Sequence, residues 1–184
     1  MAVFICLLRG VNVGGNNLIK MDALRKLCIS LGLCDPQTYV QSGNIVFQSD
    51  EREPAVLARG IGDAIEQKFG FRPEVVIRTA SEIKDAIARN PFAKRRGIEP
   101  AKLLVNFLAE APGAEVRDAI LGLKLGPEEV RIDGREIYIY FPDGMGRSKL
   151  WPAIGKKLKN PGTGRNLNTV TKLLEMAEKF DALC

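Results

Sequence analysis

The order of strand and helix patterns over the first 79 residues constrains the fold more than any other feature of the sequence. A continuous apolar run at the start predicts a buried strand, because strands covered on both faces lack polar alternation. Helically spaced apolar residues, a hairpin around Ser42-Gly43, a second helical pattern and a short strand follow. This β-α-β-β-α-β order is typical of the split βαβ, or ferredoxin-like, fold. The predicted elements are Ala2–Leu8, Met21–Leu31, Thr38–Gln41, Ile45–Gln48, Leu57–Phe69 and Glu74–Arg78.

The second half of the chain begins with the same order. A strand and a helix precede two short strands that bracket Asp133-Gly134, a strong hairpin signal. Two helical patterns follow, and no fourth strand is apparent, so the predicted order is β-α-β-β-α-α, with a helix in place of the last strand. The predicted elements are Lys102–Leu108, Glu115–Leu123, Val130–Ile132, Glu136–Phe141, Ser148–Leu158 and Asn168–Phe180.

The two patterns together predict an α+β protein with two ferredoxin-like lobes. We expect the first lobe over residues 1–79, a helix and basic linker over 80–100, and the second lobe with its C-terminal helices over 101–184. Ser81 is the predicted cap of the linker helix, which we expect to stop at Asn90-Pro91. The basic part of the linker is Lys94-Arg95-Arg96.

Composition narrows the possible chemistry. The chain contains no histidine, which removes Ser-His-Asp and Cys-His nucleophiles and histidine-based zinc sites. We expect no metal site and no cofactor.

A net charge of +5 favours anionic partners weakly. No apolar run is long enough to span a bilayer, the start does not read as a signal peptide, and the four cysteines form no CxxC pair, so we expect a cytoplasmic protein with reduced thiols and no membrane partner.

Two polar segments of the first lobe are candidate binding elements. The stretch from Leu8 to Asn17 is rich in glycine and asparagine, and such a loop between a strand and a helix can direct backbone N–H groups towards an anion. It is neither a Walker A loop nor GxGxxG, and it can equally be a connection that needs glycine at positive φ. The turn Gln41–Asn44 can likewise be a binding element or only a tight turn stabilised by its own side chains. We expect both segments at one edge of the sheet.

The stretch from Arg147 to Lys172 carries the clearest electrostatic signal. It contains seven lysines and arginines, and no acidic residue lies between Asp143 and Glu175. Phosphate-rich partners are attracted to such a stretch, although it can also be the solvated surface of two helices. Within it, Thr163–Thr169 places Arg165 beside Asn166 and Asn168, either of which is a natural helix N-cap.

These segments resemble the family of bacterial proteins catalogued as domain of unknown function 1697. The resemblance rests on four motifs in order: Leu7–Gly15, Tyr39–Phe47, Gly146 with Ser148–Leu150, and Thr163–Val170. Leu167 departs from it, because an aromatic residue is expected there. The resemblance implies two ferredoxin-like lobes and supplies no activity, so the catalytic residues are unknown. The candidate ligand-binding residues are Arg9, Gly10, Asn12, Gly14, Gly15, Gln41, Ser42, Gly43, Asn44, Ser148, Lys149, Arg165, Asn166, Asn168 and Thr169.

Three functions remain open on the sequence. The favoured one is binding of a phosphate-bearing ligand, a nucleotide or a nucleic acid, in a basic groove between the lobes where Arg9, Asn44, Lys149 and Arg165 converge. The second is an enzyme on an anionic substrate that uses lysine or carboxylate chemistry, with Asp22 and Asp143 the nearest carboxylates in sequence. The third is a scaffold or interaction protein whose polar loops are structural. The sequence leaves the oligomeric state undetermined.

Overall fold

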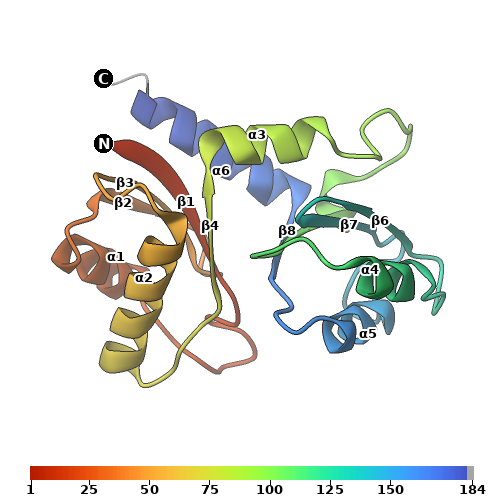
Figure 1. Ribbon diagram of the computed structural model, residues 1–184, viewed down its shortest axis with the longest axis horizontal. Helices are drawn as coiled ribbons and strands as arrows, with labels where there is room; N and C mark the ends of the chain where they lie inside the picture. The colour runs from red at the N-terminus through yellow and green to blue at the C-terminus, as the bar shows by residue number, and fades with distance from the viewer. Residues whose placement is uncertain (182–184) are drawn as a thin grey trace. The chain divides into compact units, whose positions relative to one another are not determined.

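The computed structural model describes residues 1–181 and has a mixed α+β fold (Figure 1). The chain divides into two compact units: unit 1 contains Met1–Lys84 and the segment from Lys172 onward, and unit 2 contains Asp85–Thr171. The elements of the first half of the chain are β1 (Ala2–Leu8), α1 (Met21–Ser30), β2 (Cys34–Tyr39), β3 (Asn44–Ser49), α2 (Pro54–Phe69), β4 (Val75–Thr79) and α3 (Ala80–Ala88). The later elements are η1 (Pro100–Lys102), β5 (Leu103–Phe107), α4 (Ala114–Leu121), β6 (Glu129–Asp133), β7 (Glu136–Tyr140), α5 (Leu150–Lys157), β8 (Thr163–Asn166) and α6 (Leu167–Asp181).

The sheet of unit 1 has the strand order of a split βαβ fold. Its four strands lie in the order β2-β3-β1-β4, and every neighbouring pair is antiparallel. The predicted β-α-β-β-α-β order is therefore confirmed, with Ala2–Leu8 as a central strand. Because β1 lies between β3 and β4, the loop that leaves β1 and the turn that enters β3 meet at one edge of the sheet.

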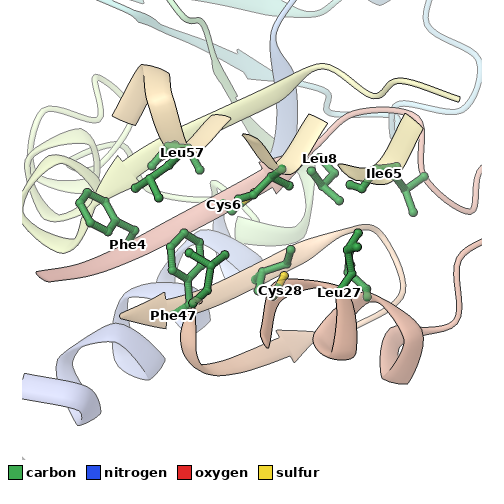
Figure 2. Close-up of a cluster of buried hydrophobic side chains, with 14 of the residues drawn as sticks. Phe4, Cys6, Leu8, Leu27, Cys28, Phe47, Leu57 and Ile65 are labelled. Atoms are coloured by element: carbon green, nitrogen blue, oxygen red, sulfur yellow. The ribbon is translucent and has the colours of Figure 1, made fainter. Parts of the chain in front are cut away.

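The core of unit 1 forms between one face of this sheet and the two helices α1 and α2 (Figure 2). Alternate residues of β1 point to this face, as the period of two in a strand requires. Leu27 and Cys28 of α1 and Leu57 and Ile65 of α2 cover them, since these positions recur on one stripe of each helix. The strand residues that the helices cover include Phe4, Cys6, Leu8 and Phe47, all at most 2% exposed.

The sheet of unit 2 has the same topology, which corrects one sequence expectation. Its strands lie in the order β6-β7-β5-β8, so a fourth strand is present, between the two predicted C-terminal helices, where we predicted none. Strand β8 is Thr163-Gly164-Arg165-Asn166, four residues without an apolar alternation, and it carries no strand signal of its own. It pairs with β5 from Leu104↔Asn166 to Phe107↔Thr163, so tertiary pairing rather than local propensity forms it.

Strand register shows that the two sheets correspond residue by residue. Ile5 in β1 lies opposite Val46 in β3 and Arg78 in β4. Val105 in β5 lies opposite Tyr138 in β7 and Arg165 in β8. In each sheet the arginine of the last strand is buried and stands one residue before the end of that strand. The two halves of the chain therefore share one architecture at the level of register, although the sequence displays no residue-level repeat.

A helix follows the last strand of each sheet directly, and each is capped by the residue that ends the strand. Thr79 Oγ1 accepts the Glu82 amide at 3.2 Å, and Glu82 Oε2 accepts the Thr79 amide at 2.8 Å. This is a capping box, so Thr79 rather than the predicted Ser81 caps α3, because the reciprocal pair satisfies two amides. Asn166 Oδ1 accepts the Thr169 amide at 2.9 Å and caps α6, as predicted.

Among the described residues, no helix is both long enough and apolar enough to cross a membrane.

Candidate functional site

The loop after β1 and the turn before β3 are joined by hydrogen bonds at the edge of the unit 1 sheet. The Leu8 amide donates to the Gly43 carbonyl oxygen at 2.9 Å, and Asn12 Nδ2 donates to the Gln41 carbonyl oxygen at 2.8 Å. Leu7 and Asn44 are register partners at the same place. The predicted meeting of the two polar segments at one edge is confirmed.

Asn12 organises the loop between β1 and α1. Its Oδ1 accepts the Ile19 amide at 2.8 Å, and its Nδ2 donates to the Ile19 carbonyl oxygen at 2.9 Å. Asn12 has a φ of +55°, a conformation that asparagine tolerates better than most residues. Asn17 Nδ2 adds a bond to the Gly10 carbonyl oxygen at 3.0 Å. Both ends of the Asn12 amide are therefore engaged in holding the loop.

The other candidate residues of this edge form tight turns. Gly14 and Gly15 have φ of +59° and +78° and lie at the tip of a small hairpin, where the Asn16 amide donates to the Val13 carbonyl oxygen at 3.0 Å. Asn44 is fully buried, and its Nδ2 donates to the Tyr39 carbonyl oxygen at 2.9 Å and to Ser42 Oγ at 3.0 Å. These bonds are turn chemistry of the kind that the sequence left open.

A shallow hollow of about 530 Å³ lies beside this edge, at the start of α1. Lys20 is the only cation that lines it, and Asp22 lines it as well. The side chain of Asp22 forms an ion pair with Arg25. The hollow thus presents one cation next to one carboxylate, and that carboxylate is held by Arg25. Its lining residues are Asn12, Leu18, Ile19, Lys20, Met21, Asp22 and Gln41.

The candidates from the motif Thr163–Thr169 have structural partners in unit 2. Arg165 is 8% exposed, and its Nη1 donates to Thr163 Oγ1 at 2.6 Å and to the Gly164 carbonyl oxygen at 2.8 Å. Asn166 and Thr169 form the cap of α6, and Asn168 is exposed. The convergence of Arg9 and Asn44 with Lys149 and Arg165 stays a prediction, because the first pair belongs to unit 1 and the second to unit 2.

The glycine-rich loop between β7 and α5 borders a larger hollow in unit 2, of about 710 Å³. Its other wall is the loop between α4 and β6. Ser148 Oγ accepts the Leu150 amide at 3.1 Å, and the Ser148 amide donates to the Met145 carbonyl oxygen at 3.1 Å, so the loop turns tightly into the helix. The lining residues are Leu125, Gly126, Pro127, Glu128, Asp143, Gly144, Gly146, Arg147, Ser148 and Lys149.

Two cations at this hollow lie where the start of a helix disfavours positive charge. The N-cap position of α5 is Lys149, which makes no side-chain capping bond, and the first turn of α5 contains no acidic residue. The N-terminus of a helix carries a partial positive charge and favours anions there. Arg147 and Lys149 are both exposed, and neither side chain takes part in a hydrogen bond or ion pair within residues 1–181. Two uncompensated cations therefore stand at a positive helix end.

Some basic residues elsewhere in unit 2 are paired with carboxylates. Arg89 lies 3.1 Å from Asp133 and 3.2 Å from Glu136. Arg95, in the segment predicted as a basic linker, lies 2.5 Å from Glu129, and this hydrogen bond raises the pKa of Arg95 above its ordinary value. The cations beside the hollow differ from these, because no counter-charge holds them.

Two carboxylates also line the hollow, and sequence reasoning identified only one of them as a candidate. Asp143 is exposed, whereas Oε2 of Glu128 is buried and accepts no hydrogen bond among the described residues. Glu128 lies against the α-carbon of Gly126, since a Cβ built there would come within 2.3 Å of Oε2. The segment Leu125–Glu128 carries no motif, and only the packing of two distant loops identifies it as a wall of the site. No cluster of three or more metal-ligating side chains occurs among the described residues.

A comparison with known protein families identifies the family of the chain. Residues 1–138 match the family described as protein of unknown function (DUF1697), which is well over half of the sequence. The chain belongs to the DUF1697 family. The predicted family is thereby confirmed, on a match that contains the motifs Leu7–Gly15 and Tyr39–Phe47, and the function of the family is not assigned.

Other comparisons show the fold of this DUF1697 protein. The structure of the conserved bacterial protein SP0830 from Streptococcus pneumoniae is similar, with a TM-score of 0.77, 22% sequence identity, and coverage of 97% of this chain and 99% of that one. At this identity the likeness concerns the fold alone. No curated protein matches the sequence. The family match ends before the loop Gly144–Lys149, so the hollow beside α5 rests on the geometry described above.

Proposed function

We propose that this DUF1697 protein binds a phosphate-bearing ligand in the hollow at the N-terminus of α5. One observation carries the proposal: Lys149 and Arg147 stand uncompensated at the positive end of a helix whose first turn has no acidic residue. An anion there would be stabilised by the helix dipole and by both cations at once. Phosphate is the anion whose charge and acceptor geometry fit such a set.

The size and lining of the hollow support a ligand larger than a single ion. A volume of about 710 Å³ falls in the range of small-molecule sites. Leu125 and Pro127 offer apolar surface opposite the glycine loop, and the buried Glu128 Oε2 is an acceptor without a donor. A nucleoside phosphate could place its phosphate at Lys149 and an N–H group towards Glu128. A cytoplasmic location, expected from the reduced cysteines, fits a ligand of this class.

Isothermal titration with inorganic pyrophosphate and with ATP tests the proposal. We expect binding that weakens at least tenfold, about 1.4 kcal/mol, in Lys149→Gln and in Arg147→Gln. Lys94→Gln is the matched control, because Lys94 is an exposed lysine of the same unit that does not line the hollow.

Three results would contradict the proposal. The wild-type protein could fail to bind both compounds, or the Lys149→Gln variant could bind them as the wild type does. Turnover of ATP with the same dependence on Lys149 would instead favour the enzyme alternative, in which the hollow holds a substrate. Equal losses in Lys94→Gln would show that the binding follows overall charge rather than this site.

A further inference from the structure

The cations at the hollow continue along the exposed face of α5. Lys149, Pro152 and Lys156 are exposed at spacings of three and four residues, whereas Leu150 and Ile154 are buried. Residues three, four and seven apart share one face of a helix. Lys157 at the end of α5 and Lys159 beyond it are exposed as well. The outer face of α5 therefore presents a stripe that begins at the hollow, formed by Lys149, Lys156, Lys157 and Lys159.

No carboxylate forms an ion pair with this stripe among the residues that the structure describes, although Glu128 and Asp143 line the hollow at which it begins. None of its four lysines takes part in a described ion pair, in contrast to Lys102 with Glu99 at 2.9 Å and Lys172 with Glu175 at 3.3 Å. The helix dipole accounts for Lys156 and Lys157, which lie in the last turn, where cations are favoured. It does not account for Lys149 at the opposite end.

We infer that the stripe binds the phosphodiester backbone of a nucleic acid, with one phosphate anchored in the hollow. This inference rests on the proposed phosphate site and names its ligand class. Lys149 and Lys156 are separated by roughly 10 Å along the helix axis, at 1.5 Å per residue. A strand that carries a phosphate every ~3.4 Å of duplex axis offers several phosphates over this distance.

The composition of the α5 face favours a nucleic acid over an anionic membrane. A helix that lies on a membrane needs an exposed apolar face, and the apolar residues Leu150 and Ile154 of α5 are inside the core of unit 2. The face also offers no exposed base-stacking platform, since Trp151 of α5 is partly buried against the core and no aromatic side chain is among the large apolar residues that are exposed in the described part of the chain. We therefore expect contacts to phosphates without base readout, and hence binding independent of sequence.

The test measures fluorescence anisotropy of labelled single-stranded RNA, single-stranded DNA and duplex DNA of mixed sequence, each at several salt concentrations. Four phosphate contacts give a slope of about −3 in log K against log salt for a single strand, which is about a 50-fold loss between 50 and 200 mM. The three probes show whether the protein binds RNA, single-stranded DNA or duplex DNA. Vesicles with phosphatidylserine serve as the competing anionic surface.

Charge-removing variants separate the stripe from the hollow. We expect Lys156→Gln/Lys157→Gln/Lys159→Gln to weaken oligonucleotide binding at least tenfold and to leave pyrophosphate binding unchanged, whereas Lys149→Gln weakens both. The control is Lys94→Gln/Arg96→Gln, two exposed cations of the same unit outside the stripe. Melting curves verify that each variant is folded.

The outcomes distinguish the two proposals. If pyrophosphate binds but the triple variant retains full oligonucleotide affinity, or no oligonucleotide binds, the inference is overturned and the phosphate site stands. If pyrophosphate does not bind, the proposed function itself fails. Binding to vesicles with the same dependence on Lys156, Lys157 and Lys159, without binding to any oligonucleotide, also rejects the inference.

Discussion

Arg78 and Arg165 occupy the same place in the two sheets. Each lies opposite the equivalent residue of a central strand, Ile5 or Val105, and each is followed at once by the N-cap residue of a helix. Both are nearly fully buried, at 1% and 8% exposure. A buried arginine at one equivalent position in both halves is unlike the usual exposed arginine, and each donates to a carbonyl oxygen of the residue before it in its own strand, Ile77 or Gly164.

The cap of α6 gives a direct stability prediction. Asn166→Ala removes the acceptor of the Thr169 amide and should lower the free energy of unfolding by about 1 kcal/mol. Asn168→Ala is the matched control, because Asn168 is exposed and makes no capping bond; its effect should stay within about 0.5 kcal/mol. Urea denaturation measures both, and equal losses would show that Asn166 does not act as the cap.

The Asn12 bonds predict that this residue matters for the fold rather than for a ligand. Asn12→Ala removes three hydrogen bonds of the loop and should cost about 1–3 kcal/mol of unfolding free energy. Asn16→Ala, at the exposed tip of the same loop, should be nearly neutral. If thermal unfolding shows no loss in Asn12→Ala while pyrophosphate binding disappears, Asn12 is a ligand contact and our assignment is wrong.

Two glycines with positive φ allow the stability cost of backbone strain to be measured apart from the cost of steric crowding. A Cβ at Gly43 would stand 2.8 Å from Leu8 Cβ, whereas a Cβ at Gly14 would meet nothing within 4 Å. Gly14→Ala should therefore cost roughly 1–2 kcal/mol from the left-handed conformation alone. Gly43→Ala should cost a further 1–3 kcal/mol, about the penalty of overpacking a core. Chemical denaturation of the two variants measures the difference, and equal losses would mean that Leu8 yields freely.

The buried thiol of Cys28 predicts a loss of stability at alkaline pH. Burial raises the pKa of Cys28 from its ordinary value of 9.0 to about 12. The folded state then holds the thiol proton where the unfolded state has released it, so stability is complete below pH 9 and falls as the pH rises towards 12. By pH 10.5 this one group should remove about 2 kcal/mol.

Cys28→Ala isolates that contribution. The variant begins less stable, because a buried side chain is truncated, but its unfolding free energy should fall less between pH 8 and pH 10.5 than that of the wild type. Burial also raises the pKa of Tyr138, and this group titrates in both proteins, so it cancels in the comparison. Parallel slopes for the two proteins would contradict the assignment to Cys28.

The cationic N-cap predicts a conflict between stability and binding. Lys149→Asp replaces a cation by a negative charge at the start of α5, and should raise the unfolding free energy by about 0.3–1 kcal/mol through the helix dipole. The same substitution should abolish pyrophosphate binding. Melting temperatures and titrations on one preparation measure both effects, and a variant that is destabilised would show that Lys149 has a structural partner.

Local patterns predicted the fold because most elements carry their own signal. The apolar run Ala2–Leu8 and the helical spacing from Met21 need no tertiary information. Strand β8 was missed because Thr163–Asn166 is short and polar, and its pairing with β5 alone makes it a strand. The cap Thr79 was readable, since Thr79 and Glu82 have the spacing of a capping box, but Ser81 is the more familiar capping residue.

The candidate site was predictable only in part. Ser148 and Lys149 were identified from a motif, and the acid-free stretch identified the charge around them. The opposite wall, Leu125–Glu128, lies about twenty residues away in sequence and has no pattern that links it to Lys149. The polar segments of unit 1 carry a clear pattern, but the pattern does not distinguish a binding site from a turn. Asparagines and glycines occur in both, and here the side chains of Asn12 and Asn44 form the hydrogen bonds of the turns.

The discontinuity of unit 1 has a consequence for how the protein is made. Leu173, Ala177 and Phe180 are buried in the segment that groups with residues 1–84, although 87 residues of unit 2 are synthesised in between. At roughly 5–20 residues per second, the ribosome needs about 4–20 s to bridge that interval. Throughout it the nascent first unit lacks the last segment that belongs to it. During this delay the incomplete first unit is a substrate for chaperones. A chain truncated before the last segment would leave the first unit permanently incomplete.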